Sequence, residues 1–352
     1  MKIAVVCGMS DEKVRARLMP LVEIDGIEQI YLIRRSPFDM RKVKTLSPPI
    51  MFRWFLPFVE LFRIMALCFV CIKEKPSCIY GIYFVPHGIY AGIFGKIFKI
   101  PVIQELIGTD RPKVARVRLF QKLLAQAKYI GVRGSISRQE IVSWGVAEEN
   151  IFISNAVNIL DYKLFSPDNS PKIYDLIYCG YMDQNKQVDL LIDAVKNLNQ
   201  EIPDLRVVLV GDGPERSALE MKATSLGVDK QINFVGKQPI ESVPSFLNQS
   251  RVFVMTSAFE GLPVAMLEAL SCGLPVVIPD VGDISDVAIH GINGLLFEAN
   301  NVSSLTNYLR KVLIDESLYQ KLRNGAEEMH KHFIDSYTIK HTQQTWESML
   351  GL

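Results

Sequence analysis

Short runs of apolar residues recur along the chain and alternate with segments of helical pattern. The runs are almost uniformly apolar, which is typical of strands buried on both faces of a parallel sheet. Five lie in the first half and five in the second: KIAVVCG, CIYGIYF, PVIQELIG, YIGVRG and IFISNAV, then YDLIYCG, RVVLVGDG, INFVG, RVFVMTS and PVVIPDVG. This alternation predicts an α/β protein with two doubly wound, Rossmann-like domains that face each other across a cleft.

A polar segment with two prolines, SPDNSPK at residues 166–172, separates the two groups of strands. Proline and small polar residues in this arrangement are typical of a linker. We therefore expect an N-terminal domain over residues 1–165 and a C-terminal domain over residues 172–335. Ligands of such sheets bind past the carboxyl ends of the strands, so we expect the cleft there.

The distribution of charge along the chain is uneven. The 352 residues carry a formal net charge of +1, and 49% are hydrophobic against 22% charged, which is a globular composition. Residues 1–165 hold 24 Lys and Arg against 14 Asp and Glu, a balance of +10, whereas residues 166–352 hold 15 against 24, a balance of −9. The basic first domain is therefore expected to face an anionic partner.

The most apolar stretch lies at residues 48–76, PPIMFRWFLPFVELFRIMALCFVCIKEKP. Its charge-free run, residues 64–72, is far shorter than the roughly 18–20 residues that cross a bilayer. Two interpretations fit: a buried pair of helices, or a helix at a membrane surface. In the second, aromatic side chains would enter the membrane and basic ones would contact anionic lipid: Trp54, Phe55, Phe58, Arg41, Lys42 and Lys44.

The six cysteines are scattered through the chain. Cys68 and Cys71 form a C-x-x-C pair, but it lies in an apolar helical pattern with no second pair and no nearby histidine. Small buried side chains are therefore favoured over a zinc or redox site, and we expect no metal. The opening MKIAVVCGMS indicates a buried strand rather than a secretion signal, so we expect a reduced, cytoplasmic protein.

Two motifs at strand ends are candidates for binding an anion. Gly211-Asp212-Gly213 follows a strong strand, but Arg216 stands where the dinucleotide fingerprint needs a third glycine. That motif alone favours a plain turn. Gly180 also ends a strand, and Lys186 comes just before an amphipathic helix, where it would be solvated or would stabilise a bound diphosphate.

Two isolated glutamates, Glu260 and Glu268, bracket seven uncharged residues. Glu260 follows a predicted strand, Pro263 suits the first turn of a helix, and Gly261 permits close approach of a ligand. The free amides of Val264 and Ala265 would form an anion site at the helix start. One carboxylate could accept hydrogen bonds from a sugar and the other from a ribose. The alternative is that both are ordinary cap and surface residues.

With these motifs the chain resembles the retaining glycosyltransferases of family 4, which have the two-domain glycosyltransferase-B fold. The most specific likeness is E-x₇-E with a following G-x-P-V-V element, here EGLPVAMLEALSCGLPVV. The likeness runs nearly from end to end and includes further segments: CGYMDQNKQVDLLIDA, LVGDGPE, INFVGKQ, VGDISDVAIHGINGLLF, ISNAVNILDYKLFSP and VPHGIYAGIFGKIFKIPVIQELIGTD.

The resemblance implies a role for each candidate residue. Glu260 would contact the transferred sugar, Glu268 the ribose of a nucleotide sugar, and Lys186 the diphosphate. His87 would lie near the reacting centre and complete the catalytic set with Glu260 and Lys186. Backbone near residues 236–238 would bind the base, with UDP-sugars favoured over GDP-sugars. The remaining donor contacts would come from Gly180, Tyr181, Gly211, Asp212, Gly236, Gly261, Leu262, Val264 and Ala265.

The resemblance also implies the reaction. A hexosyl group would be transferred with retention and without a metal or other cofactor, the leaving diphosphate helping to deprotonate the acceptor hydroxyl. The acceptor would be lipid-linked or a glycan, at the inner face of a membrane, in lipopolysaccharide, other cell-surface polysaccharide or glycolipid synthesis. No nucleic acid partner is expected. Asp110 would bind an acceptor hydroxyl or only cap a helix, and residues 336–352 would form a final helix that crosses back to the first domain.

Three positions depart from the family pattern. Tyr181 replaces the usual Arg, which removes a charge-assisted contact worth roughly 1.5–3 kcal/mol. Ile107-Gly108 replaces a His-Gly pair, and the early glycine loop is only CGMS. Two other interpretations therefore stay open: a non-catalytic subunit that has kept the fold, or another sugar-nucleotide enzyme such as an epimerase.

Overall fold

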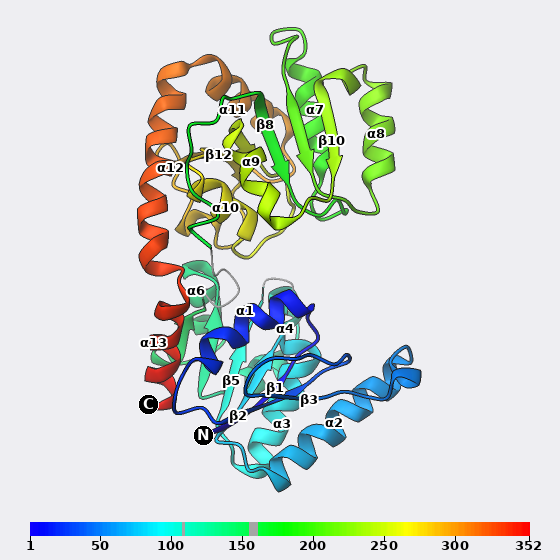
Figure 1. The fold of residues 1–352 in the computed structure, drawn as a ribbon, viewed down its shortest axis with the longest axis vertical. Helices are drawn as coiled ribbons and strands as arrows, with labels where there is room; N and C mark the ends of the chain where they lie inside the picture. Colours follow the sequence, from blue (N-terminus) through cyan, green and yellow to red (C-terminus); the bar gives the residue numbers. More distant parts are fainter. Residues whose placement is uncertain (108–109, 155–160) are drawn as a thin grey trace. The chain divides into compact units, whose positions relative to one another are not determined.

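The computed structural model describes residues 1–107, 110–154 and 161–352, which form two compact α/β units (Figure 1). The first unit comprises Met1–Ile159 and Ile339–Leu352, and the second comprises Leu160–Thr338. The boundary therefore precedes the linker predicted at residues 166–172. The reason is packing: Phe165 is buried in the core of the second unit, where the Ser271 hydroxyl donates a 2.6 Å hydrogen bond to its carbonyl oxygen.

A parallel sheet forms the centre of the first unit, with seven strands among the described residues in the order β3-β2-β1-β4-β5-β6-β7. Most of these strands are built from Val, Ile and other apolar residues that are buried on both faces, as expected for an α/β sheet. Their bounds are β1 Lys2–Val6, β2 Gln29–Ile33, β3 Val43–Leu46, β4 Cys78–Ile82, β5 Val102–Glu105, β6 Tyr129–Val132 and β7 Ile151–Ile153.

Helices cover both faces of this sheet (Figure 1). One face carries α1 (Asp11–Val22) and α13 (Ile339–Leu350), which pack against each other and share a core that contains Leu18 and Trp346. The other face carries α2 (Leu56–Lys73), α3 (Ile89–Phe98), α4 (Arg111–Ala115), α5 (Arg118–Leu124) and α6 (Ser135–Ser143). The last segment of the chain is therefore part of the first unit.

The second unit repeats the three-layer plan around a parallel sheet in the order β10-β9-β8-β11-β12-β13. Its strands are β8 Tyr174–Cys179, β9 Val207–Val210, β10 Ile232–Gly236, β11 Ser250–Val254, β12 Val276–Pro279 and β13 Gly294–Phe297. Helices α7 (Val188–Leu198), α8 (Arg216–Ser225) and α11 (Val302–Ile314) cover one face. The other face carries α9 (Val243–Asn248), α10 (Val264–Ser271) and α12 (Glu316–Ser336).

Two doubly wound, parallel-sheet units confirm the predicted fold class. Each of the ten predicted runs contains a strand, whereas β2, β3 and β13 were missed. The interpretation of residues 48–76 as a buried pair of helices is wrong. A short 3₁₀ turn (η1, Ile50–Phe52) precedes the single helix α2, one side of which is exposed. Among the described residues, no helix is both long and apolar enough to span a membrane.

Candidate active site

The candidate residues gather where the strand order of each sheet reverses. Strands are added outward on one side of β1 and then on the other side of β4, and likewise around β8 and β11. Parallel sheets bind ligands past the carboxyl ends of the strands at such a switch point. His87 follows β4, whereas Lys186 follows β8 and Glu260 follows β11. Their positions in the sequence therefore translate into one site in each unit.

In the second unit, Lys186 and Glu260 form an ion pair. The Lys186 Nζ donates a hydrogen bond to Glu260 Oε1, and both side chains are partly buried. The backbone of Lys186 is held on both sides: its N–H donates to the Asp183 carboxylate at 3.0 Å, and its carbonyl accepts from the Thr256 hydroxyl at 2.8 Å. The loops that follow β8 and β11 are thus joined by two contacts: the hydrogen bond between Thr256 and the Lys186 backbone, and the ion pair between Lys186 and Glu260.

The backbone around Glu260 is fixed by a third loop, which follows β12. A Cβ at Gly282 would lie 2.1 Å from the Glu260 carbonyl oxygen, and the φ of Gly282 is +59°, so only glycine fits without strain. Downstream, α10 begins at Val264 with no side-chain cap from Pro263. The first-turn amides of this helix therefore lack the acceptor that a capping side chain supplies.

Glu268 lies in the second turn of α10, and its carboxylate has no hydrogen-bond partner among the described residues. Burial raises the pKa of Glu268 to about 7. Burial also raises the pKa of the Cys179 thiol, and the nearby Glu268 carboxylate raises it further. Because Cys179 ends β8, Glu268 stands beside the carboxyl end of that strand. Because burial destabilises the ionised form of Glu268, a ligand that donates hydrogen bonds to its carboxylate would stabilise that form.

A pocket of about 340 Å³ lies at the ends of β8 and β9. Its lining includes four predicted donor-binding residues, Gly180, Tyr181, Gly211 and Asp212, together with Lys237 and Gln238 from the predicted base-binding segment. The other lining residues, which were not predicted, are Cys179, Val210 and Val243. Lys186, Glu260 and Glu268 do not line it. Lys237 adds a cation to the pocket wall, whereas the prediction gave its segment, residues 236–238, only backbone contacts with the base.

The backbone is very tightly packed where the two strand ends meet. Gly211 has a φ of +139°, and a Cβ there would lie 1.8 Å from the carbonyl oxygen of Gly180. A side chain at position 211 would force the two loops apart. The Gly-Asp-Gly motif is therefore more than a plain turn, since it shapes the pocket wall.

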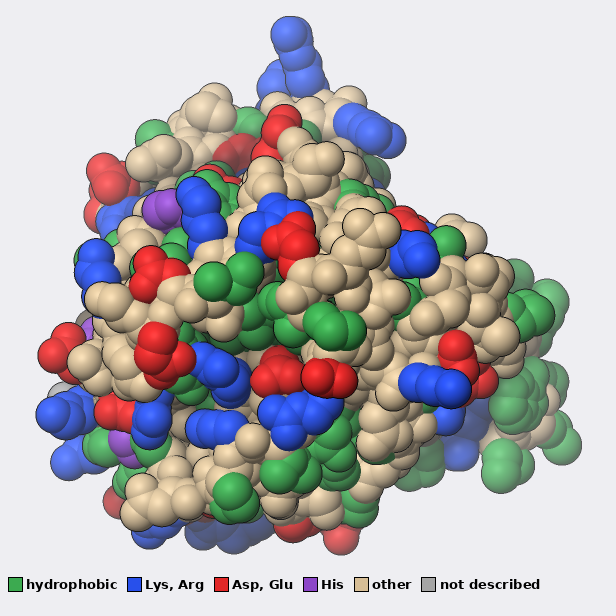
Figure 2. Space-filling model, turned by 90° about the horizontal axis from the view of Figure 1, so that it is seen from above, with side chains coloured by type: hydrophobic (Ala, Val, Ile, Leu, Met, Phe, Trp, Pro, Cys, Tyr) green, Lys and Arg blue, Asp and Glu red, His purple; other side chains and the backbone are tan. Residues whose placement is uncertain are grey.

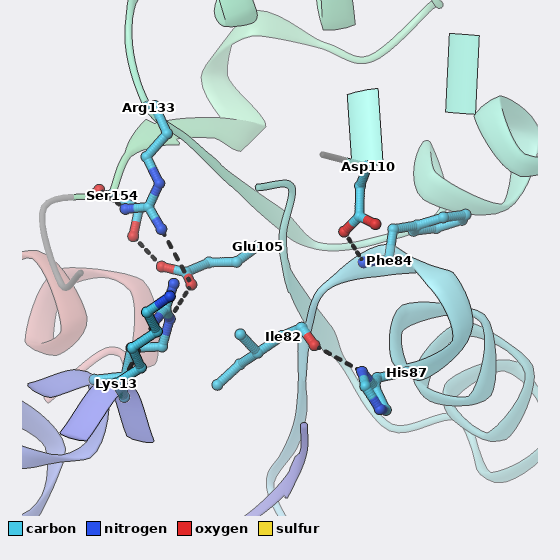
Figure 3. Close-up of polar contacts among 9 residues, drawn as sticks. Lys13, Ile82, Phe84, His87, Glu105, Asp110, Arg133 and Ser154 are labelled. Carbon is cyan, nitrogen blue, oxygen red and sulfur yellow. Dashed lines mark hydrogen bonds and ion pairs between the residues drawn. The ribbon is translucent and has the colours of Figure 1, made fainter. Parts of the chain in front are cut away.

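In the first unit, His87 is buried beside the loop that follows β1. Its Nδ1–H donates to the Ile82 carbonyl oxygen at 3.1 Å (Figure 3). The Nε2 atom is buried and has no partner within the described part of the chain. Burial, with a smaller contribution from Arg63, lowers the pKa of His87 to about 3, so the ring is neutral at pH 7. A Cβ at Gly8 would lie 2.7 Å from the imidazole, so the glycine leaves room for this ring.

Asp110 holds the turn that carries His87. Its carboxylate accepts a 2.7 Å hydrogen bond from the Phe84 N–H, and burial raises the pKa of Asp110 to about 6 (Figure 3). Asp110 precedes α4 but makes no side-chain hydrogen bond to the start of that helix. Asp110 thus occupies the N-cap position of α4 without the side-chain hydrogen bond that a capping residue usually makes. Of the Ile107-Gly108 pair, Gly108 lies outside the described residues.

A buried polar cluster at the ends of β5, β6 and β7 was not predicted. Glu105 accepts a 2.7 Å hydrogen bond from Arg17 Nε and a second bond from the Ser154 hydroxyl, and Arg133 Nη2 lies 3.9 Å from it (Figure 3). Burial would raise the pKa of Glu105, but the two guanidinium groups outweigh it and lower that pKa. The sequence signal was faint, because Glu105 and Arg133 are isolated charges at the ends of apolar runs.

Comparison with known proteins finds a family likeness within the second unit. Residues 164–329, slightly less than half of the chain, match the family model described as "Glycosyl transferases group 1". This segment contains Lys186, Glu260, Glu268 and all the residues of the 340 Å³ pocket.

Relatives and solved structures extend the likeness beyond this segment. An uncharacterized glycosyltransferase of Methanocaldococcus jannaschii is 24% identical over 79% of this chain and 77% of its own length. The lipopolysaccharide 1,6-galactosyltransferase of Escherichia coli is 29% identical over 51% of this chain and half of its own length. The structure of Anabaena HepE in complex with UDP-glucose matches all of both chains with a TM-score of 0.77 at 18% identity, which shows the same fold.

Proposed function

We propose that this protein transfers a hexosyl group from a nucleotide sugar to a lipid-linked or glycan acceptor, with retention of configuration and without a metal. The observation that carries the proposal is the Lys186–Glu260 pair, placed at the switch point of the unit that contains the match to group 1 glycosyl transferases and flanked by the uncapped start of α10. A cation, free amides and a carboxylate in one place match the diphosphate and hydroxyl groups of a nucleotide sugar.

In this proposal each described group has one task. Lys186 and the amides of Val264 and Ala265 bind the diphosphate, and they stabilise its charge as the bond to the sugar C1 breaks. Glu260 with the backbone of Gly261 and Leu262 accepts hydrogen bonds from the sugar hydroxyls. Glu268 accepts them from the ribose.

The base occupies the pocket between Gly180, Tyr181, Gly211, Asp212 and the segment that follows Gly236. UDP-sugars are the favoured donors, since the pocket is small and a solved structure of the same fold is a complex with UDP-glucose. The Lys237 ammonium group provides positive charge near the position where Tyr181 replaces the family's arginine.

The first unit would supply the acceptor side. With Nδ1–H engaged by Ile82, the Nε2 atom of His87 carries a lone pair and can accept a hydrogen bond from a sugar or acceptor hydroxyl. The acceptor proton passes to the leaving diphosphate as the new bond to C1 forms. Asp110 would orient the acceptor through the His87 turn, because its carboxylate is occupied by the Phe84 amide.

We place the reaction in polysaccharide, lipopolysaccharide or glycolipid synthesis at the cytoplasmic face of a membrane. A relative's printed activity, a lipopolysaccharide galactosyltransferase, supports this class of acceptor. The balance of +10 in residues 1–165 also fits an acceptor that carries phosphate groups.

Thermal unfolding with UDP, GDP, ADP, CMP or dTDP tests the donor site. Bound ligand raises stability by RT ln(1 + [L]/Kd), so one nucleotide, with UDP expected, should raise the Tm of the wild type. Glu268→Ala should lose this shift, whereas Glu241→Ala, an exposed glutamate of the same unit, should keep it. Glu260→Ala and Lys186→Ala should abolish sugar transfer and leave the fold intact.

Two outcomes would contradict the proposal. The absence of any nucleotide shift in the wild type would favour a non-catalytic subunit that has kept the fold. Normal turnover by both Glu260→Ala and Lys186→Ala would remove the pair from the mechanism.

A further inference from the structure

The outward side of α2 is apolar along its whole length. Leu61, Met65, Phe69 and Ile72 follow one another at spacings of four, four and three residues, so they form one stripe, and each is 50–61% exposed. The opposite side of the helix packs in the core through Ala66, Leu67 and other residues. Monomeric proteins rarely expose contiguous apolar patches larger than a few hundred Å², and such patches mark interaction sites.

The segment before α2, residues 50–56, extends this stripe. Trp54 is 84% exposed, and four of its apolar neighbours in the sequence are exposed as well: Ile50, Met51, Phe55 and Leu56. Figure 2 shows hydrophobic side chains clustered at one edge of the molecule, on the side where Figure 1 draws the segment that leads into α2. We call α2 and residues 50–56 together the apolar ridge.

The charges that surround the apolar ridge are positive. Residues 40–59 and 75–104 contain no Asp or Glu. Within α2 and its end, Glu60 accepts hydrogen bonds from Arg63 and Tyr90, and Glu74 pairs with Lys2. Exposed cations are frequent by contrast, and the guanidinium group of Arg35 lies 5.3 Å from the centre of the Trp54 ring. The surface therefore combines apolar and basic side chains without exposed acids to offset them.

A basic pocket lies on α3, the helix that packs beside α2. The pocket has a volume of about 430 Å³, and its lining includes Lys96, Lys99 and Lys128. On the outer side of the same helix, Ile93 and Ile97 are exposed. Three ammonium groups around a pocket of this size suit a phosphate group.

We propose that the apolar ridge lies on an anionic lipid bilayer, with its aromatic and aliphatic side chains in the interface and the lysine pocket on α3 facing lipid phosphates. Amphipathic helices bind in this way when an apolar side is flanked by Lys and Arg. A protein partner would have to match an apolar surface edged mainly by cations, whereas an anionic bilayer offers both components everywhere. The inference rests on this surface alone and holds whether or not the protein transfers a sugar.

Vesicle binding by the full-length protein tests the inference. Wild type should sediment with vesicles of phosphatidylcholine and phosphatidylglycerol, and bind vesicles of phosphatidylcholine alone at least about tenfold more weakly. Of the three tryptophans, Trp346 is buried and Trp144 is partly buried against the core of the first unit, whereas Trp54 is exposed. A blue shift of the emission on binding should therefore come mainly from Trp54 and be largely lost in Trp54→Phe. Lys96→Gln with Lys99→Gln should weaken binding and reduce its dependence on salt.

Two matched double variants distinguish binding through the apolar ridge from binding through any exposed apolar side chain. Leu61→Ser with Phe69→Ser should reduce binding to anionic vesicles at least about tenfold without changing the Tm. Met221→Ser with Ile314→Ser changes comparably exposed apolar residues in the second unit and should bind like the wild type. Equal binding by the Leu61–Phe69 pair, or no binding by wild type, would overturn the inference. So would a wild-type dimer that this pair converts to a monomer, because the ridge would then dock on a second copy.

Discussion

The ammonium group of Lys186 donates a hydrogen bond to the carboxylate of Glu260, and so joins the loops that follow β8 and β11. Each side chain thereby neutralises the other in the absence of a ligand. A diphosphate would compete for the lysine and leave Glu260 free to meet the sugar hydroxyls. Under the proposed function, the pair would therefore link binding of the charged part of the donor to exposure of the carboxylate.

Lys186→Gln should weaken the binding of UDP and leave the binding of uridine unchanged. A charge-assisted hydrogen bond is worth about 1.5–3 kcal/mol, so the Kd for UDP should rise about 10- to 100-fold. Isothermal titration with UDP and uridine measures both values. Lys196→Gln, an exposed lysine later in α7, is the matched control and should keep wild-type affinities. Equal weakening for UDP and uridine would mean that Lys186 does not contact the diphosphate.

Glu268→Gln should become more stabilising as the pH rises. In the folded protein burial raises the pKa of Glu268 from 4.5 to about 7. The contribution of protonated Glu268 to the stability of the folded protein is therefore complete below about pH 4.5. This contribution falls with rising pH and is lost as the pH passes through 7, where the buried carboxyl ionises in the folded protein. The variant should match the wild type at pH 4 and exceed its free energy of unfolding by roughly 3 kcal/mol at pH 8.5. Urea unfolding at the two pH values checks this, and an equal difference at both would refute it.

Glu105→Gln should destabilise the first unit strongly. The substitution removes the charge that balances Arg17 and Arg133, which stay buried, and breaking such a cluster typically costs about 3–5 kcal/mol. Glu201→Gln removes the exposed carboxylate that pairs with Arg310 and should cost no more than about 1 kcal/mol. Denaturant unfolding of both variants gives the comparison. Similar costs would show that water reaches the Glu105 cluster.

Gly211→Ala should prevent nucleotide binding, and Gly227→Ala should not. Both glycines have a positive φ, +69° at Gly227 and +139° at Gly211. An alanine therefore costs roughly 1 kcal/mol of backbone strain at position 227 and more at position 211, where φ lies outside the left-handed helical region. Only at position 211 would the new Cβ meet backbone, the Gly180 carbonyl oxygen at 1.8 Å, whereas nothing lies within 4 Å at position 227. The nucleotide-dependent shift in Tm separates the two effects. A retained shift in Gly211→Ala would place the nucleotide elsewhere.

The fold was predictable because strands of a parallel sheet that are buried on both faces have uninterrupted apolar sequences. The missed strand β3, VKTL, alternates and lies half-exposed at the edge of its sheet, so its pattern is weaker than that of central strands. The predicted linker contained two prolines and polar residues, yet Phe165, which precedes it, already packs in the core of the second unit. Composition marks an exposed segment, but only packing shows which core its neighbours join.

The candidate site was predictable where one residue follows one strand end. Lys186 and Glu260 were found in this way, since the carboxyl ends of adjacent parallel strands converge. The Glu105 cluster was not found. Its importance depends on residues up to 88 positions apart in the chain, as in the bond between Arg17 and Glu105. A pattern along the chain contains no record of such distant pairs.

Trp346 is fully enclosed in the first unit, where its ring centre lies 4.9 Å from that of Tyr80. Yet it reaches this place from α13, after the whole second unit has passed. During synthesis on the ribosome, the first unit therefore cannot complete its core until residues 339–352 emerge, which leaves a gap at the place of Trp346. The second unit, which is continuous in sequence, can finish folding earlier. A chaperone that shields the gap during this interval would act on the first half of the protein and not on the second.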